Sequence, residues 1–152
     1  MSASSVFPDD AVDEVPSLLA DPVTQVPPRN HASPGPGRWR GGLGLWREWR
    51  IDCAMAQLST NLDRFKFRPF GLAGGEPAAP SALYLIRDGQ KQALRSKVTN
   101  MMLKNGDIVR LETSGGGGFG EARLRARELV DRDVRLGYVS AAAARDSYGQ
   151  GG

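Results

Sequence analysis

The chain has little of the chemistry that cysteine and histidine supply. Its 152 residues include one cysteine, Cys53, and one histidine, His31. A single cysteine excludes an internal disulfide, and one residue of each type is too few for the usual ligands of a zinc site, so we expect no metal. Cys53 lies in apolar sequence, where a buried inert thiol is favoured over a nucleophile.

Long hydrophobic runs are also missing. No stretch approaches the roughly eighteen apolar residues that a membrane span needs, and the N-terminus lacks the basic and then apolar pattern of a signal peptide. We therefore expect a cytoplasmic protein with no membrane partner. Glycine and proline are plentiful instead, with 19 and 10 residues, so many turns are expected.

Charge is divided unevenly along the chain. Residues 1–30 hold five acidic side chains, one arginine and five prolines, which gives this segment a net charge of −4. Since the whole chain carries +3, the remainder carries about +7. This composition predicts a disordered, acidic and proline-rich lead over residues 1–34, followed by a basic folded region at 35–150.

Alternating apolar and polar residues predict several strands. In the strand expected at 42–52, Trp49 and Ile51 share one face and Glu48 lies on the other. The segment 54–59 is expected to pair with this strand. Further strands are expected at 81–87, at 98–103 (where a short helical turn is the alternative) and at 107–113.

Helical patterns follow the last predicted strand. One helix is expected at 121–135, with Gly137 as its C-terminal cap. A second is expected to begin at Ser140, a good N-cap residue, and to run through Tyr148. The order of elements indicates an α+β fold, in which a mixed β-rich domain is followed by two C-terminal helices.

Four consecutive glycines, Gly115, Gly116, Gly117 and Gly118, separate the last strand from the first helix. With Gly120 they satisfy G-x-G-x-x-G, the pattern of dinucleotide-binding loops. The second parallel strand of such a unit is missing, because another helical pattern follows, and no Gly-Lys-Ser/Thr completes a P-loop. Two interpretations remain: backbone N–H groups that bind an anion, or glycines that allow tight packing against backbone.

Basic residues give further candidate sites. Arg64 and Lys66 flank a phenylalanine in a loop rich in glycine and proline, and Lys97 lies in L-R-S-K. Each could hold a carboxylate or phosphate, and a solvated charge is the alternative. The segment G-R-W-R-G-G at 37–42 is similar to RNA-binding segments, but it occurs once and continues into a strand. A turn is therefore favoured there, and we expect no nucleic-acid partner.

Six motifs occur in a recognisable order. They are G-P-G-R-W-R-G-G-L-G-L-W-R-E-W-R-I, D-R-F-K-F-R-P-F-G-L-A-G-G, R-S-K-V-T-N with L-K-N-G-D-I-V-R-L-E-T, S-G-G-G-G-F-G, R-A-R-E-L-V-D-R-D-V-R-L-G-Y-V-S and A-A-R-D-S-Y-G. In this order they resemble the C-terminal region of the hydantoinase B / 5-oxoprolinase family, over residues 35–149. The chain departs from the family pattern at 30–34, where an aspartate-serine-diglycine stretch is usual, and at 120–122, where glycine-aspartate-proline is usual.

The resemblance implies a truncated B-type subunit of an ATP-dependent hydrolase of cyclic amides such as hydantoins or 5-oxoproline. Such a subunit completes the ring opening of a phosphorylated intermediate, and we expect this fragment to be inactive alone. ATP and Mg are expected on a partner A-type subunit, so this chain is expected to bind no cofactor itself and to act in a hetero-oligomer. Residues 1–34 are then expected to be out of frame.

The resemblance leaves two points open. A non-catalytic assembly region of a hydantoinase-like complex, or of an ATP-dependent ketone carboxylase complex, is the alternative function. The resemblance places no catalytic residue on these motifs. Because the implied intermediate is phosphorylated and therefore anionic, the anion-binding candidates remain Arg64, Lys66, Lys97 and Gly115 to Gly118.

Overall fold

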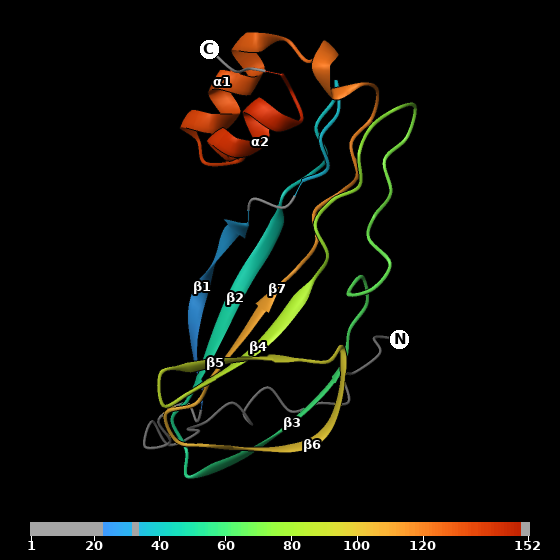
Figure 1. Cartoon of the computed structure of the whole chain (residues 1–152). Helices are drawn as coiled ribbons and strands as arrows, with labels where there is room; N and C mark the ends of the chain where they lie inside the picture. Colours follow the sequence, from blue (N-terminus) through green and yellow to red (C-terminus); the bar gives the residue numbers. More distant parts are fainter. Residues whose placement is uncertain (1–22, 32–33, 150–152) are drawn as a thin grey trace, which may run out of the picture.

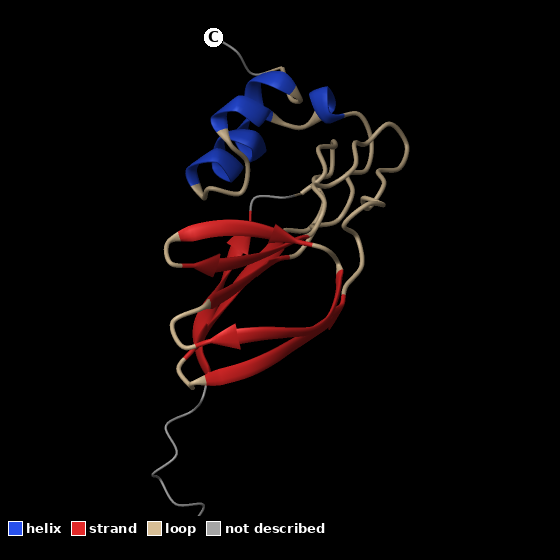
Figure 2. Cartoon of the chain, turned by 60° about the horizontal axis from the view of Figure 1, so that its bottom comes forward, coloured by secondary structure: helices blue, strands red, loops and turns tan. Residues whose placement is uncertain are grey.

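The computed structural model describes residues 23–31 and 34–149. Strands occupy one end of the molecule and helices the other, with loops between them (Figures 1 and 2). The strands are β1 (Val23–His31), β2 (Gly44–Ile51), β3 (Met55–Asn61), β4 (Ala82–Arg87), β5 (Gln90–Leu94), β6 (Lys97–Lys104) and β7 (Ile108–Glu112). The helices are α1 (Arg127–Arg135) and α2 (Ala141–Asp146), preceded by a 3-10 turn at Ala122–Leu124. This is the α+β fold that the sequence predicts.

Two sheets form the strand end of the molecule. The larger sheet has the order β1-β2-β7-β4-β5, and β3 and β6 form a separate pair. Every pairing of neighbouring strands is antiparallel. Such sheets can bury one face and leave the other in water, which agrees with the alternation read from the sequence.

The hydrophobic core of the strand end lies between the two sheets. Its buried members are Ile51, Leu83, Leu85, Leu103 and Val109. Leu103 comes from β6 and the others come from the larger sheet, so both sheets contribute. The packing is incomplete, because a cavity of about 340 Å³ with almost entirely apolar walls remains between the sheets.

The opposite face of the larger sheet carries charge. Glu48 on β2 accepts a hydrogen bond from Nε of Arg110 on β7 and forms an ion pair with it, and the guanidinium of Arg110 lies 4.9 Å from the ring centre of Trp46. These pairs lie outward while Ile51 and Val109 lie inward, as the alternation in the sequence predicts. Cross-strand pairs of this kind add roughly 0.2–1 kcal/mol each.

β1 departs from the prediction of a disordered lead over residues 1–34. It forms the edge of the larger sheet by pairing with β2, although its sequence shows little alternation. Its register breaks between Val26 and Arg29, which places two prolines at an irregularity of an edge strand, where proline is tolerated. The rest of the predicted lead lies outside the described residues, apart from Pro34, so its disorder stays a prediction.

Strand pairing shows two further differences from the sequence analysis. The segment predicted to pair with β2 forms β3 and pairs with β6, because β1 and β7 already occupy both edges of β2. β5 was not predicted, since its polar residues are mostly exposed and show no apolar alternation. It follows the predicted turn at Asp88-Gly89, where both residues have positive φ as a tight hairpin requires.

The helical end begins later than predicted. Residues 122–124 form a 3-10 turn and α1 starts only at Arg127, because Arg125 and Ala126 have extended backbone. The predicted caps are present: Gly137 has a φ of 70° after α1, and the hydroxyl of Ser140 accepts a hydrogen bond from the amide of Ala143. No helix in the described part of the chain is long and apolar enough to cross a membrane.

A buried carboxylate fastens the turn between β6 and β7. Asp107 is 1% exposed and accepts hydrogen bonds from Arg87 at 2.8 and 2.5 Å and from the amide of Lys104 at 2.8 Å. The hydrogen-bonded guanidinium of Arg87 holds the pKa of Asp107 below its usual range. Its folded pKa is therefore lower than its unfolded pKa, so its ionisation stabilises the fold at neutral pH.

We expect Asp107→Asn to lower the free energy of unfolding at pH 7 by about 2 kcal/mol, the worth of hydrogen bonds to a charged group. The stabilisation by Asp107 is fully present above its unfolded pKa of about 4 and is lost as the pH falls through its lower folded pKa. The difference between wild type and variant should therefore shrink on acidification below about pH 4. Urea unfolding followed by tryptophan fluorescence measures it, with the exposed Asp131→Asn as control. A difference that is the same at neutral pH and at the lowest accessible pH would contradict this account.

Candidate functional site

Three chain segments run side by side between the sheets and the helices, at 34–42, 70–76 and 115–120 (Figure 1). We call them the glycine neck. They are joined by backbone hydrogen bonds in both directions. Six of these bonds run from an amide to a carbonyl, with the donor residue named first: Gly35 to Gly116, Gly116 to Gly42, Glu76 to Pro36, Gly118 to Glu76, Leu72 to Gly118 and Gly120 to Leu72. In addition, Trp39 and Phe119 each donate an amide to the carbonyl of the other. The neck is thus held by main-chain contacts rather than by an apolar core.

The neck requires glycine because its backbones approach too closely for side chains. A Cβ atom at Gly118 would lie 1.9 Å from the carbonyl oxygen of Pro36, and one at Gly117 would lie 1.9 Å from that of Phe70. A Cβ atom at Gly41 would lie at the same distance from the carbonyl oxygen of Gly116. Real Cβ atoms essentially never approach within 3.0 Å, so each of these positions excludes every other residue type unless the backbone moves.

This geometry decides between two interpretations of the glycine run for part of its length. The amides of Gly116 and Gly118 donate to the carbonyls of Gly42 and Glu76, so they are not offered to an anion. Gly115 is buried, and Gly117 packs against backbone. α1 begins nine residues after the last of the four glycines, at Arg127, so the run does not open this helix either. Close backbone packing is the interpretation that the contacts support.

The three basic candidates lie elsewhere on the loop and sheets. Arg64 is exposed with a φ of 66°, and its carbonyl accepts the amide of Ser81. Lys66 stacks over the ring of Phe67 at 5.5 Å. Lys97 is exposed and opposes Asn61 where β3 pairs with β6. Among the described residues no hydrogen bond or ion pair joins Arg64, Lys66 or Lys97 to the glycine run. Anion binding by them stays a prediction.

A buried ion cluster joins the neck to the helices. Asp133 on α1 is 4% exposed, and its Oδ2 accepts Nε of Arg40 at 2.9 Å and Nη2 of Arg125 at 2.8 Å. Arg125 also donates to the carbonyl of Arg38 at 3.1 Å, and Arg40 lies over the ring of Tyr138. The carboxylate of Asp133 therefore ties Arg40 of the neck to the helical end, and Arg125 adds a second link to the neck at Arg38.

The sequence patterns did not predict this cluster. Asp133 lies within the helix expected at 121–135. Its position between Val130 and Val134, on the apolar side of that helix, was the available signal. An acid on a buried face needs a cationic partner, because an isolated buried charge is costly. The sequence could not say which of the many arginines would supply it.

A second buried group lies beside the cluster. Tyr148 belongs to the helical core with Ala122, Val130, Val139 and Ala144. Burial raises the pKa of Tyr148, and the nearby Arg125 works against that shift. The amide of Gly37 also approaches its oxygen, but the contact falls short of hydrogen-bond geometry. The hydroxyl is therefore neutral at physiological pH, and Tyr148 holds its place by packing within the helical core.

The described residues hold no group of three or more His, Cys, Asp or Glu side chains that could bind a metal ion. The acids that are buried, Asp107 and Asp133, are each occupied by arginine. What the site offers is a link held by main-chain hydrogen bonds, with charged and apolar side chains on its surface.

Comparisons with known proteins agree with the order of motifs. Residues 29–122, from the end of β1 to the 3-10 turn, match the family model of hydantoinase B/oxoprolinase. An uncharacterized protein of Methanocaldococcus jannaschii is 39% identical over 118 residues, which are 76% of this chain and 20% of that protein. This chain belongs to the hydantoinase B/oxoprolinase family.

Two solved structures contain a similar fold. The crystal structure of the ATP-dependent caprolactamase from Pseudomonas jessenii has a TM-score of 0.75 at 28% identity, over 84% of this chain and 23% of its own. The nucleotide-free structure of acetone carboxylase has a TM-score of 0.69 at 21% identity, over 86% of this chain and 22% of its own, and shares the fold. The chain spans between 7% and 20% of the length of the curated relatives it matches.

We expect Gly118→Ala to destabilise the protein by about 3 kcal/mol or more, because the new methyl group collides with backbone that cannot rotate away. Gly42→Ala is the matched control, since a Cβ there meets nothing within 4 Å and its φ is ordinary. This control should be neutral or stabilise by about 0.4–1 kcal/mol through the unfolded chain. Thermal unfolding measured by circular dichroism compares them. Equal effects of the two substitutions would refute the close-packing account.

We expect Asp133→Asn to loosen the helical end selectively, at a cost of about 3 kcal/mol, because it leaves two largely buried guanidinium groups without an anion. Asp146→Asn is the control, since Asp146 is exposed on α2 and forms no ion pair with a described residue. Hydrogen exchange should accelerate over residues 122–149 and stay unchanged over β4 and β7. A uniform increase over both regions would show that the cluster does not act locally.

Proposed function

We propose that this chain is the C-terminal region of a B-type subunit of an ATP-dependent enzyme that hydrolyses cyclic amides. The family match over residues 29–122 carries the proposal. The 28% identity and TM-score of 0.75 to an ATP-dependent caprolactamase support the hydrolase over the carboxylase alternative, because acetone carboxylase shares only the fold. The substrate class is a small cyclic amide, and the expected cytoplasmic location stays part of the proposal.

In the proposed complex, ATP and Mg bind to the partner A-type subunit, where ATP supplies the phosphoryl group that activates the ring carbonyl. The glycine neck of this chain is a poor phosphate cradle, since the amides of Gly116 and Gly118 are already bonded to carbonyls. This supports placing the nucleotide elsewhere. The contribution of this chain is then to complete the B-type subunit, in which ring opening takes place.

The proposed contribution of the neck is to hold two folded ends at a fixed separation. The sheet core and the helical core are separate clusters, and the neck segments run between them. Backbone hydrogen bonds have little freedom compared with long side chains, so the neck transmits position rather than flexing. A surface that spans both ends would be presented to the rest of the complex in one arrangement.

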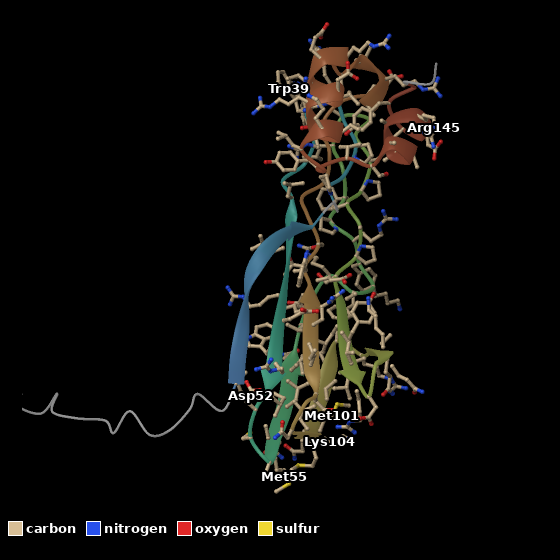
Figure 3. All side chains as sticks on the ribbon, turned by 90° about the vertical axis from the view of Figure 1, so that its left-hand side faces the viewer. Trp39, Asp52, Met55, Met101, Lys104 and Arg145 are labelled. Carbon is tan, nitrogen blue, oxygen red and sulfur yellow. The ribbon has the colours of Figure 1, made fainter. Side chains whose placement is uncertain are left out.

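An apolar ridge on the neck favours the alternative role of an assembly region. It consists of Trp39, Leu72 and Phe119, which are 59%, 58% and 52% exposed. Phe119 forms backbone bridges with both other residues, so the three lie in one row on adjacent segments. Trp39 lies at the helical end in Figure 3. Exposed apolar clusters of this kind mark interaction surfaces.

A chimera tests the proposed function. Residues 35–149 of this chain replace the matched part of the Pseudomonas jessenii caprolactamase, and ATP-dependent lactam hydrolysis is measured. We expect kcat within about tenfold of the parent, because a shift of 1.4 kcal/mol in the barrier is the most that equivalent packing should cause. A soluble, fully assembled chimera with no hydrolysis would overturn the proposal. The 152-residue chain alone, given ATP and 5-oxoproline or hydantoin, is expected to be inactive, and turnover by it alone would contradict the expected need for other subunits.

The same chimera separates the two roles. Trp39→Ser with Phe119→Ser removes both aromatic side chains of the apolar ridge without substituting any glycine of the neck. If the ridge serves assembly, these substitutions dissociate the complex, as size-exclusion chromatography would show. Lost turnover in an intact complex would instead place the ridge beside the reacting groups.

A further inference from the structure

A shallow concavity of about 440 Å³ lies between the two helices at the end of the molecule. Its walls come from both helices. It is lined by Arg127, Asp131, Val134, Arg135, Ala141, Ala144 and Arg145. We call it the arginine concavity. Figure 3 shows Arg145 at the outer edge of the helical end, away from the sheets.

Helix geometry explains why the arginines meet there. Arg127, Asp131 and Arg135 are spaced four residues apart, so they lie in one row along α1. Gly137 ends α1 with a positive φ, and the chain turns back so that α2 packs beside it. Arg145, in the last turn of α2, then faces the same concavity. Residues 18 positions apart in the sequence are thus brought to one surface.

The three guanidinium groups are not used by the fold. Arg127, Arg135 and Arg145 are exposed, and none of them forms a hydrogen bond or ion pair through its side chain with another described residue. By contrast, Arg40 and Arg125 are both occupied by Asp133. The concavity holds three positive charges and one negative charge, Asp131, which leaves a local excess of about two positive charges.

The rest of the lining restricts what kind of anion fits. Val134, Ala141 and Ala144 are small apolar residues that leave room for an aliphatic side chain. No aromatic residue lines the concavity on which a base could stack, and Asp131 would repel a continuous phosphate backbone. Carboxylates spaced on either side of an apolar residue match the arginines, the apolar floor and the central acid together.

We infer that the arginine concavity binds an acidic segment of a partner protein, in which glutamate or aspartate side chains flank a leucine or similar residue. The arginines bind the carboxylates, and the aliphatic side chain lies against Val134 and Ala144. This surface is separate from the glycine neck and from the apolar ridge, and the inference does not depend on the cyclic-amide hydrolase activity.

Fluorescence anisotropy of the full 152-residue chain tests this inference. The probe is a fluorescein-labelled peptide of sequence E-E-L-E-E-L-E-E, compared with the same peptide carrying serine at both leucine positions. The chain with Arg127→Gln, Arg135→Gln and Arg145→Gln is compared with a matched control carrying Arg95→Gln, Arg123→Gln and Arg132→Gln. The control removes the same charge from exposed arginines outside the concavity.

We expect the concavity variant to bind the leucine peptide about tenfold or more weakly than wild type, which is the loss of some 1.4 kcal/mol, while the control variant stays within about threefold. Wild type should bind the serine peptide more weakly than the leucine peptide. The concavity variant should show no such preference. Equal losses in the two arginine variants, or no preference for leucine, would overturn the inference. Tighter binding of a labelled single-stranded RNA through the same three arginines would also overturn it in favour of nucleic acid.

Unfolding of the variant is separated from loss of binding. All six arginines are exposed, so circular dichroism and the Tm should match wild type for both variants. If the triple variant is unstable, Arg145→Gln alone is compared with Arg132→Gln alone, and a several-fold loss confined to Arg145→Gln supports the inference. Equal affinity of these two single variants counts against it.

Discussion

Direct contact between backbones in the glycine neck is the constraint on which the rest of this structure depends. Where most domains join their parts through side-chain packing, here peptide groups of three segments bond to one another across glycines. The carbonyl of Pro36 would lie 1.9 Å from any Cβ at Gly118, so the contact exists only because that atom is absent. The sheet core and the helical core are separate clusters, and the neck segments that run between them set their relative position.

The ion cluster around Asp133 adds a second kind of link. One carboxylate oxygen receives both Arg40 from the neck and Arg125 from the helical end, so three segments converge on a single acceptor. A buried charge of this kind is weak evidence for net stability, because removing both ions from water is costly. Its directional contacts do define how the helices sit on the neck. The glycines bring the segments close, and the ions select one orientation of the helical end.

Local patterns in the sequence predicted most of the elements but not their assembly. The alternation around Trp49 and Ile51, the turn at Asp88-Gly89 and the cap at Ser140 act within a few residues, and the structure shows each of them. The partner of β3 depends on which strands already flank β2. β1 forms by backbone pairing with β2, which does not require alternating apolar residues. The sequence left two interpretations of the glycine run, anion binding and close backbone packing. They could not be separated there, because the carbonyls that accept its amides lie in distant segments such as 70–76. The cluster of Asp133 likewise joins residues 93 positions apart.

The absence of Cβ atoms in the neck has a consequence for how this region can vary. Every single-base change that replaces glycine introduces a side chain or a stop, so no conservative exchange exists for Gly41, Gly117 or Gly118. The outward-facing neighbours are under no such restriction, since Trp39, Leu72 and Phe119 project away from the contacts that hold the segments together. A gene for this region can therefore change what the neck displays while its backbone path stays the same. The neck separates the positions that preserve shape from those that can acquire a new partner.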